Sequence, residues 1–202
     1  MNDFWIYLGL GFDHITDPGG YDHILFIIAL CAIYTLSQWR QVLILVTAFT
    51  IGHSITLALA TLRLLSFRSD VIELLIPITI LITAVVNFFY QERTSPFSTR
   101  IKSRKWGRYS LALAFGLIHG LGFSSYLRSL LGREADIVTP LLAFNLGLEL
   151  GQLLIVSLVL GLSHFILNAF RGHRRDWVLI ISGIVAGMAI SLIINNSLIA
   201  GS

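Results

Sequence analysis

Charged side chains are scarce in this 202-residue sequence, and their scarcity decides the class of protein. Asp, Glu, Lys and Arg together make up 12% of the residues, hydrophobic residues make up 55%, and the mean hydropathy is +0.81. Soluble domains carry about 25% charged residues. A chain with half that share has too few polar side chains to cover a water-facing surface, so we predict a membrane protein.

Long polar segments are also missing. The longest runs over residues 91–107 and holds 17 residues, which is far too short for a nucleotide-hydrolysing domain. Any transport by this chain would therefore be passive, ion-coupled or driven by another protein. We expect a single transmembrane domain over residues 1–202.

Cysteine is nearly absent, and the basic excess is confined to one place. The single Cys31 cannot form an intrachain disulfide, which excludes a disulfide framework and a multi-cysteine metal site. The net charge is +3, but six of the fourteen basic residues lie between Arg93 and Arg108. Such clustering indicates membrane topology, so no nucleic-acid partner is expected.

Hydrophobic runs of helix length predict six membrane-spanning helices, because a crossing needs about 20 residues. The runs cover residues 21–36, 41–62, 70–90, 108–130, 137–162 and 177–198. Residues 3–11 are apolar and aromatic but too few to cross. The predicted fold is an all-α polytopic bundle of six transmembrane helices, preceded by a short N-terminal helix that is interfacial or re-entrant.

Basic residues are distributed unequally between the two ends of the predicted bundle. Ten Lys and Arg residues fall on the first, third and fifth loops, and four fall on the termini and the remaining loops. The positive-inside rule places the richer end in the cytoplasm. We expect the bacterial inner membrane as the location, with the N- and C-termini outside.

Ionisable side chains inside the apolar runs are the main functional signal, because a charge at mid-bilayer costs at least about 2.5–3.5 kcal/mol. Three of them lie about 17–18 Å into a core about 30 Å thick, and an Asp-His pair opens the first run. Imidazoles with a carboxylate suit Zn, Ni, Co or Fe. The predicted metal ligands are His23, His53, His119, Asp22 and Glu149. A proton relay and structural hydrogen bonding are the alternatives.

A second tier of polar residues lies near these positions. It comprises His14, Ser54, Asn145, Gln152 and Glu73. Asn145 and Gln152 share one helix face with Glu149, at spacings of i, i+4 and i+7. Ser54 follows His53 and either orients a substrate or hydrogen-bonds to its own helix.

Four segments with an ionisable residue inside an apolar run carry a family resemblance. They are GYDHILF (20–26), TAFTIGHSITLA (47–58), FGLIHGLGF (115–123) and FNLGLELGQ (144–152). Together they resemble the HupE/UreJ family of hydrogenase and urease accessory membrane proteins, which implies a permease-like protein associated with nickel or a related divalent ion. That family has a His, five residues and then Asp-His at its first span. Here seven residues separate His14 from Asp22, with a turn predicted at 17–20, so His14 stays in the second tier.

Three functions fit the predicted site. The leading one is a secondary permease for nickel or a related transition metal ion, in which His23 and Asp22 capture the ion. His53 and His119 would hold it at mid-depth, and Glu149 would balance its charge. The alternative is a zinc-dependent intramembrane hydrolase that uses a metal-activated water, with Glu149 or Asp22 as general base.

A membrane metal chaperone or sensor is the second alternative. The expected cofactor or cargo in all three cases is a divalent transition metal, Ni or Zn. The expected partners are the lipid bilayer, the metal ion and proteins of metalloenzyme maturation.

Overall fold

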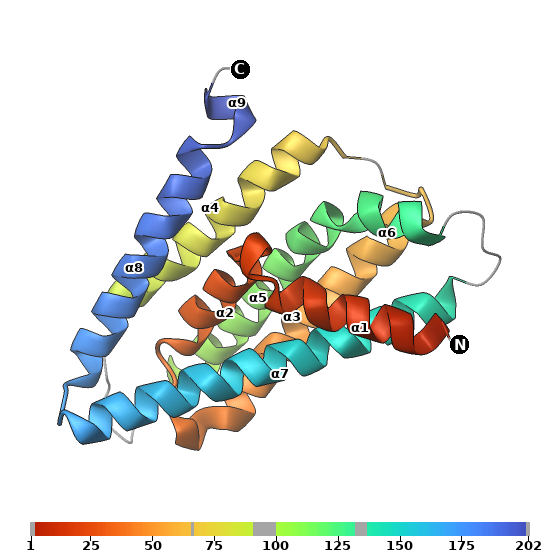
Figure 1. Cartoon of the computed structure of the whole chain (residues 1–202). Coiled ribbons are helices and arrows are strands. Elements are labelled where there is room, and N and C mark those ends of the chain that lie inside the picture. Colours follow the sequence, from red (N-terminus) through yellow and green to blue (C-terminus); the bar gives the residue numbers. More distant parts are fainter. Residues whose placement is uncertain (1–2, 66, 91–99, 132–136, 201–202) are drawn as a thin grey trace.

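The computed structural model describes residues 3–65, 67–90, 100–131 and 137–200, which form helices joined by turns (Figure 1). The long helices are α3 (Trp39–Thr61), α4 (Ser69–Phe88), α5 (Arg100–Gly122), α7 (Val138–Ala169) and α8 (Arg174–Ile194). The shorter ones are α1 (Asp3–Thr16), η1 (Pro18–Gly20), α2 (Asp22–Cys31), η2 (Leu36–Gln38), α6 (Ser124–Leu131) and α9 (Ser197–Ala200). The predicted all-α class is confirmed.

Four helical segments of the described chain are long and apolar enough to cross a membrane. They are Leu36–Thr61, Ser69–Phe88, Val138–Ala169 and Arg174–Ile194. A fifth crossing results if Trp106–Gly122 and Ser124–Leu130, which are bent by 48° at Phe123, count as one. These helices are those of an integral membrane protein.

The first predicted span, 21–36, differs from the structure. Its helix, α2, holds ten residues, about half of what a crossing needs. The run breaks after Cys31, and Thr35 then begins η2, where its backbone N–H donates to Gln38 Oε1 at 3.1 Å. Apolar content alone does not distinguish a helix from such a turn. The hydrophobic run in the sequence therefore extends past Cys31, where the helix ends.

Three helix pairs surround α2. α3 packs along α5, α1 along α7, and α4 along α8 (Figure 1). α2 lies among them, in contact with α1, α3, α4, α7 and α8. Its buried residues are His23, Leu25, Phe26, Ile27, Ala29 and Cys31. A helix that is apolar on all sides must be enclosed, so this short helix occupies the centre of the bundle.

Glycines bring two of these pairs into backbone contact. A Cβ atom on Gly120 of α5 would lie 2.2 Å from the His53 carbonyl oxygen of α3, and one on Gly147 of α7 would lie 1.9 Å from the Leu8 carbonyl oxygen of α1. No other residue fits such an approach, which is typical of small-residue packing between membrane helices. The first contact places His53 beside the turn of α5 that carries His119.

The two ends of the bundle are distinct. At one end, α3, α5 and α8 begin and α4 and α7 end; we call it the Arg108 end. Arg108 Nη1 donates to the Tyr34 hydroxyl at 3.4 Å, and the guanidinium groups of Arg108 and Arg174 lie 5.9 and 5.4 Å from the Tyr90 ring. These contacts tie the segment after α2 to α4, α5 and α8. Residues 91–99 of the predicted basic loop, and Arg133, lie outside the described residues.

α1 and α2 follow one another along the bundle as an interrupted helix. α1 packs against the first half of α7 and runs parallel to it, reaching Gly151 with Ile15. α2 continues toward the Arg108 end of the bundle. There the Asn87 side chain of α4 donates to the Ala29 carbonyl oxygen of α2 at 2.7 Å. The interruption is η1, whose first turn is capped by Asp17. The helix predicted over residues 3–11 is thus longer and lies against α7.

Candidate functional site

Four histidines from four helices meet beside η1. They are His14 at the end of α1, His23 at the start of α2, His53 in α3 and His119 in α5. The ring centroids are 4.7 Å apart for His14 and His23, and 5.1 Å apart for His23 and His119. The His53 ring lies 6.0 Å from that of His14 and 6.1 Å from that of His23. We call these four rings the imidazole cluster, and it includes the second-tier His14.

The imidazole cluster is buried and has few hydrogen-bond partners. His53 and His119 are 0% exposed and His23 is 5% exposed. Five ring nitrogens have no partner among the described residues: Nε2 of His14 and of His23, both nitrogens of His53, and Nδ1 of His119. A buried polar atom left unpaired costs about 1–3 kcal/mol. Five in one place are typical of a site that binds a ligand.

Asp22 decides which nitrogen of His23 carries the proton. Its Oδ1 lies 2.9 Å from His23 Nδ1 and also accepts from the His23 backbone N–H at 2.8 Å. An ionised carboxylate can only accept, so Nδ1 donates and Nε2 keeps a free lone pair. A carboxylate orients metal-binding histidines in this manner. The described geometry is thus that of an acceptor for His23, and the role of Asp22 as a metal ligand stays a prediction.

Thr79 of α4 decides which nitrogen of His119 carries the proton. Its Oγ1 lies 3.0 Å from His119 Nε2, and the same hydroxyl donates to the Ile76 carbonyl oxygen at 2.7 Å. A hydroxyl has one hydrogen, so Thr79 accepts from Nε2–H, and Nδ1 of His119 keeps its lone pair. Thr79 was not among the predicted site residues. The polar face that it shares with Thr83 and Asn87, at i, i+4 and i+8, is the signal that could have found it.

Two of the four ring spacings, 4.7 Å for His14–His23 and 5.1 Å for His23–His119, match those of imidazoles that share one tetrahedral ion, whereas the two spacings from His53 are longer, at 6.0 and 6.1 Å. With metal–nitrogen distances of about 2.0–2.1 Å, the centroids of two such rings lie about 5 Å apart. As the rings stand, no three His, Cys, Asp or Glu side chains of the described residues are arranged to hold a metal ion. The rings of His14 and His53 would have to turn about their side-chain torsions. The imidazole cluster therefore brings four imidazoles together without forming a metal site in the described structure.

Glu149 and Gln152 lie in a different contact, between α3 and α7. Thr47 donates to Glu149 Oε1 at 3.0 Å, and Thr50 donates to Gln152 Oε1 at 2.7 Å. We call these four side chains the α3–α7 polar contact. Thr47 precedes His53 by six residues, about 9 Å along the helix. The described structure thus gives the Glu149 carboxylate a hydroxyl partner and does not bring it to the imidazole cluster.

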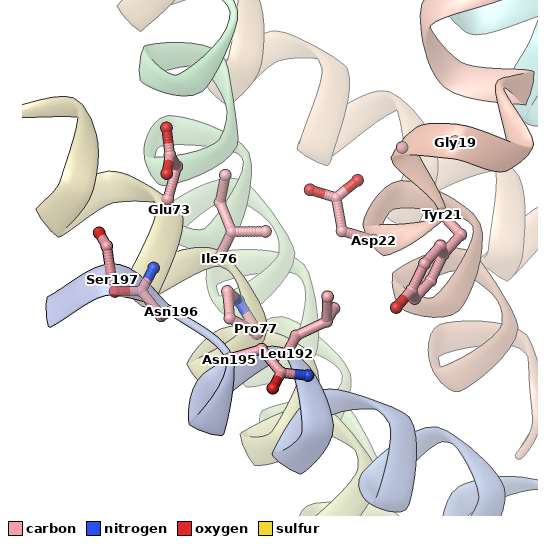
Figure 2. A pocket seen from close by; sticks show the side chains of 11 residues that line it. Gly19, Tyr21, Asp22, Glu73, Ile76, Pro77, Leu192, Asn195, Asn196 and Ser197 are labelled. Carbon is pink, nitrogen blue, oxygen red and sulfur yellow. The ribbon is translucent and has the colours of Figure 1, made fainter. Parts of the chain in front are cut away.

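The contacts of the remaining second-tier residues in the described structure lie outside the imidazole cluster. Ser54 donates to the Thr50 carbonyl oxygen at 2.7 Å, which matches the predicted bond to its own helix. Asn145 likewise donates to a carbonyl oxygen of α7 at 2.8 Å. Glu73 is exposed and lines a pocket that also reaches Asp22 (Figure 2).

Two pockets, each of about 460 Å³, open beside the imidazole cluster and share the η1 turn. The Asp22 pocket is lined by Asp22, Glu73 and the α8–α9 turn (Figure 2). The His14 pocket is lined by Asp13, His14 and Phe123, among others. Phe123 sits at the bend between α5 and α6, with its ring centroid 4.0 Å from that of His14. Residues of the imidazole cluster or bonded to it therefore border both pockets.

A bundle of apolar helices around a buried group of imidazoles defines a polytopic membrane protein with a nitrogen-rich interior site. The chain belongs to the HupE/UreJ family: the family model described as HupE / UreJ protein matches residues 1–196, which confirms the predicted resemblance. Membership suggests a membrane accessory or transport protein for a metal, nickel or cobalt. No curated protein and no solved structure matches the chain.

Proposed function

We propose that this protein is a secondary permease that moves nickel, or a related divalent transition metal ion, across the membrane by way of the imidazole cluster. The observation that carries the proposal is the meeting of four imidazoles with five buried ring nitrogens that lack partners among the described residues. Imidazole nitrogens suit Ni, Zn and Fe. A cation bound among them would satisfy one nitrogen of each ring, four of the five, and offset the free energy of leaving these four unpaired.

The imidazole cluster suits an ion that must leave as well as enter. Nε2 of His23 and Nδ1 of His119 are already oriented by hydrogen bonds on the far side of each ring. His14 and His53 would complete the coordination by turning, and would release the ion by turning back. Exchangeable ligands of this kind favour transport over a permanent catalytic metal.

The position of Glu149 favours the permease over the zinc hydrolase. A hydrolase needs a carboxylate base within hydrogen-bond reach of the metal-bound water. Glu149 is instead bonded to Thr47, and Asp22 is bonded to His23. Each carboxylate has one oxygen engaged in these contacts, and no contact in the described structure assigns either of them the role of a base, so we retain the permease as the proposed function.

The interruption between α1 and α2 also supports transport. Discontinuous helices in transporters place their ends at the substrate site near the middle of the membrane. Here His14 lies in the last turn of α1 and His23 in the first turn of α2, with η1 between them. A change of angle at η1 would separate these two rings and alter access to the ion.

We place the Arg108 end in the cytoplasm of a bacterial cell, with both termini on the other side of the inner membrane. The described Arg108 end has nine basic residues and the other end has three: Arg40, Arg100, Lys102, Arg104, Lys105, Arg108, Arg171, Arg174 and Arg175, against Arg63, Arg68 and Arg128. This imbalance supports the orientation by the positive-inside rule. The Asp22 pocket, between the start of α4 and the end of α8, would then accept the ion from outside.

Metal content and uptake test the proposal. We expect purified protein to retain nickel by elemental analysis, and His53→Ala and His119→Ala to lose it. His164→Ala is the matched control, because His164 is exposed and bonds to Asn168 of its own helix. Proteoliposomes with the parent protein should accumulate radioactive nickel, and those with either cluster variant should not.

The outcomes of this experiment separate the three functions. A parent protein that neither binds nor takes up nickel contradicts the proposal. Metal that survives chelator washing, without uptake, would favour the hydrolase. Readily exchanged metal without uptake would favour a chaperone or sensor.

A further inference from the structure

The Asp22 pocket is anionic and lies between three parts of the chain. It is bordered by residues 19–22, by the first turns of α4 with Glu73, and by the α8–α9 turn (Figure 2). The described lining contains two carboxylates and no Lys, Arg or His. At about 460 Å³ it can admit a divalent ion with six waters, since each water takes about 30 Å³.

Oxygen atoms are the groups that a hydrated divalent ion would meet in this pocket. Besides the carboxylates, Asn195 and Asn196 contribute side-chain amides at the end of α8, and the partial negative charge of a helix C-terminus attracts cations. Pro77 has no N–H, so the Glu73 carbonyl four residues earlier lacks its helical partner. Carboxylate, amide and carbonyl oxygens suit a hard, hydrated cation.

Asp22 joins this pocket to the imidazole cluster. Its side chain lines the pocket and is 26% exposed, while its Oδ1 holds His23 Nδ1 at 2.9 Å. The His23 ring, with its unpartnered Nε2, lies 5.1 Å from the ring of His119. An ion that passes Asp22 therefore reaches two oriented lone pairs. This adjacency gives the pocket a destination for a cation, which two carboxylates alone would not.

The His14 pocket is the competing route and is less suited. Its carboxylates are Asp13 and Asp17, but Asp17 is used to cap η1, accepting from the Gly19 N–H at 2.8 Å. The ring of Phe123 covers His14 on this side, at 4.0 Å between centroids. His14 itself lines this pocket, but its Nε2 is buried; of the two pockets, only the Asp22 pocket is lined by a carboxylate that the described structure shows bonded to an imidazole.

We propose that the Asp22 pocket is the entrance for the cation, and that Glu73 captures the hydrated divalent ion before it exchanges water for imidazole nitrogens. This inference rests on the proposed function, because it supplies the imidazole cluster with its ion. Glu73 stands on the exposed rim and acts through its charge, and Asp22 stands behind it at the passage to His23.

The rate of nickel loading tests the entrance. Ni²⁺ at subsaturating concentration is mixed with purified protein, and binding is followed in time for the parent, Glu73→Gln and Asp13→Asn. Asp13 is the matched control, because it is an exposed carboxylate of the other pocket. Glu73→Gln should load about three- to tenfold more slowly at low salt, with the amount bound at saturation unchanged. Asp13→Asn should load at the parent rate.

Two further readouts separate charge from a structural role. The difference in loading rate between Glu73→Gln and the parent should shrink as the salt concentration is raised, because exposed charges are screened. Glu73→Asp should restore most of the loading rate.

A bulky label tests the entrance by steric blocking. In a Cys31→Ser background, a bulky thiol label on Asn195→Cys should slow loading, whereas the same label on Leu10→Cys in the His14 pocket should not.

The possible failures are distinguishable. If Glu73→Gln binds nickel at the parent rate, the proposal that the Asp22 pocket is the entrance is wrong. The proposal that the imidazole cluster binds nickel is unaffected by that result. If Asp13→Asn alone is slow, the His14 pocket is the entrance. If the parent protein binds no nickel at all, the proposed function fails and the entrance fails with it.

Discussion

The imidazole cluster and the α3–α7 polar contact are two groups of buried polar side chains that share helix α3 yet differ in hydrogen bonding. In the α3–α7 polar contact, each Thr hydroxyl of α3 meets a side-chain oxygen of α7 at 2.7–3.0 Å. In the imidazole cluster, five ring nitrogens have no partner in the described structure. The first group has one buried atom without a partner among the described residues, Gln152 Nε2, against five in the second.

This difference separates polar residues whose hydrogen bonds join two helices from buried polar residues that have no partner in the described structure. A carboxylate or amide paired with a hydroxyl stabilises the contact of two membrane helices by about 0.6 kcal/mol on average. Unpaired imidazoles do the opposite until something binds them. Burial of a polar residue in a membrane helix is therefore a weaker sign of function than burial without a partner.

The largest expected effect is on metal-linked stability. Nickel at about 100 times its dissociation constant should stabilise the folded protein by about 2.7 kcal/mol. His119→Ala should lose this stabilisation because it removes an oriented donor. Glu149→Gln should keep it, because Glu149 lies in the other group. Thermal unfolding with and without nickel measures the stabilisation in both variants. An equal loss of stabilisation in His119→Ala and Glu149→Gln would contradict the difference between the two groups.

Asp22→Asn should weaken nickel binding by about 10- to 100-fold, the range found for outer partners of metal-binding histidines. The amide no longer holds Nδ1–H of His23 by a charge-assisted bond at 2.9 Å. Isothermal titration with nickel measures the change. Thr47→Val, which removes a hydroxyl from the α3–α7 polar contact, is the control, and an affinity loss of the same size there would contradict the prediction.

Gly120→Ala should push α3 from α5, because its Cβ would lie 2.2 Å from the His53 carbonyl oxygen. Overpacking of this kind destabilises by about 1–3 kcal/mol, and it should also weaken nickel binding by moving His53 from His119. Gly183→Ala is the control, since no atom lies within 4 Å of the added Cβ. Unfolding free energies and nickel titrations of both variants check the prediction. Unchanged binding in Gly120→Ala would show that the α3–α5 distance does not set the site.

The smallest expected effect is the coupling between Thr47 and Glu149. A double-mutant cycle of Thr47→Val and Glu149→Gln should give about 0.6 kcal/mol, and at most about 1.7 kcal/mol. Unfolding free energies of the four proteins measure it. A coupling near zero, together with a loss of nickel binding in Glu149→Gln, would return Glu149 to the metal site.

Several features of the site could be predicted because each depends on one segment of sequence. His53 and His119 interrupt apolar runs near their middle, and Asp22 directly precedes His23, so depth and adjacency follow from position alone. Glu149 meets the same criterion of depth, yet it pairs with Thr47. Depth along a helix does not specify the direction in which a side chain points, and the rotation of α7 about its axis is set by its packing against α1 and α3.

Composition and the order of apolar runs by themselves determined that this protein is a helical membrane protein, because the transfer of side chains into lipid is nearly additive along a chain. Only the tertiary structure decided which polar groups meet. The η1 turn lies between His14 and Asp22, and the centroid of the His14 ring lies 4.7 Å from that of the His23 ring. Thr79 contacts His119 and Glu149 contacts Thr47 for the same reason: contacts between distant helices depend on packing geometry, which no single segment encodes.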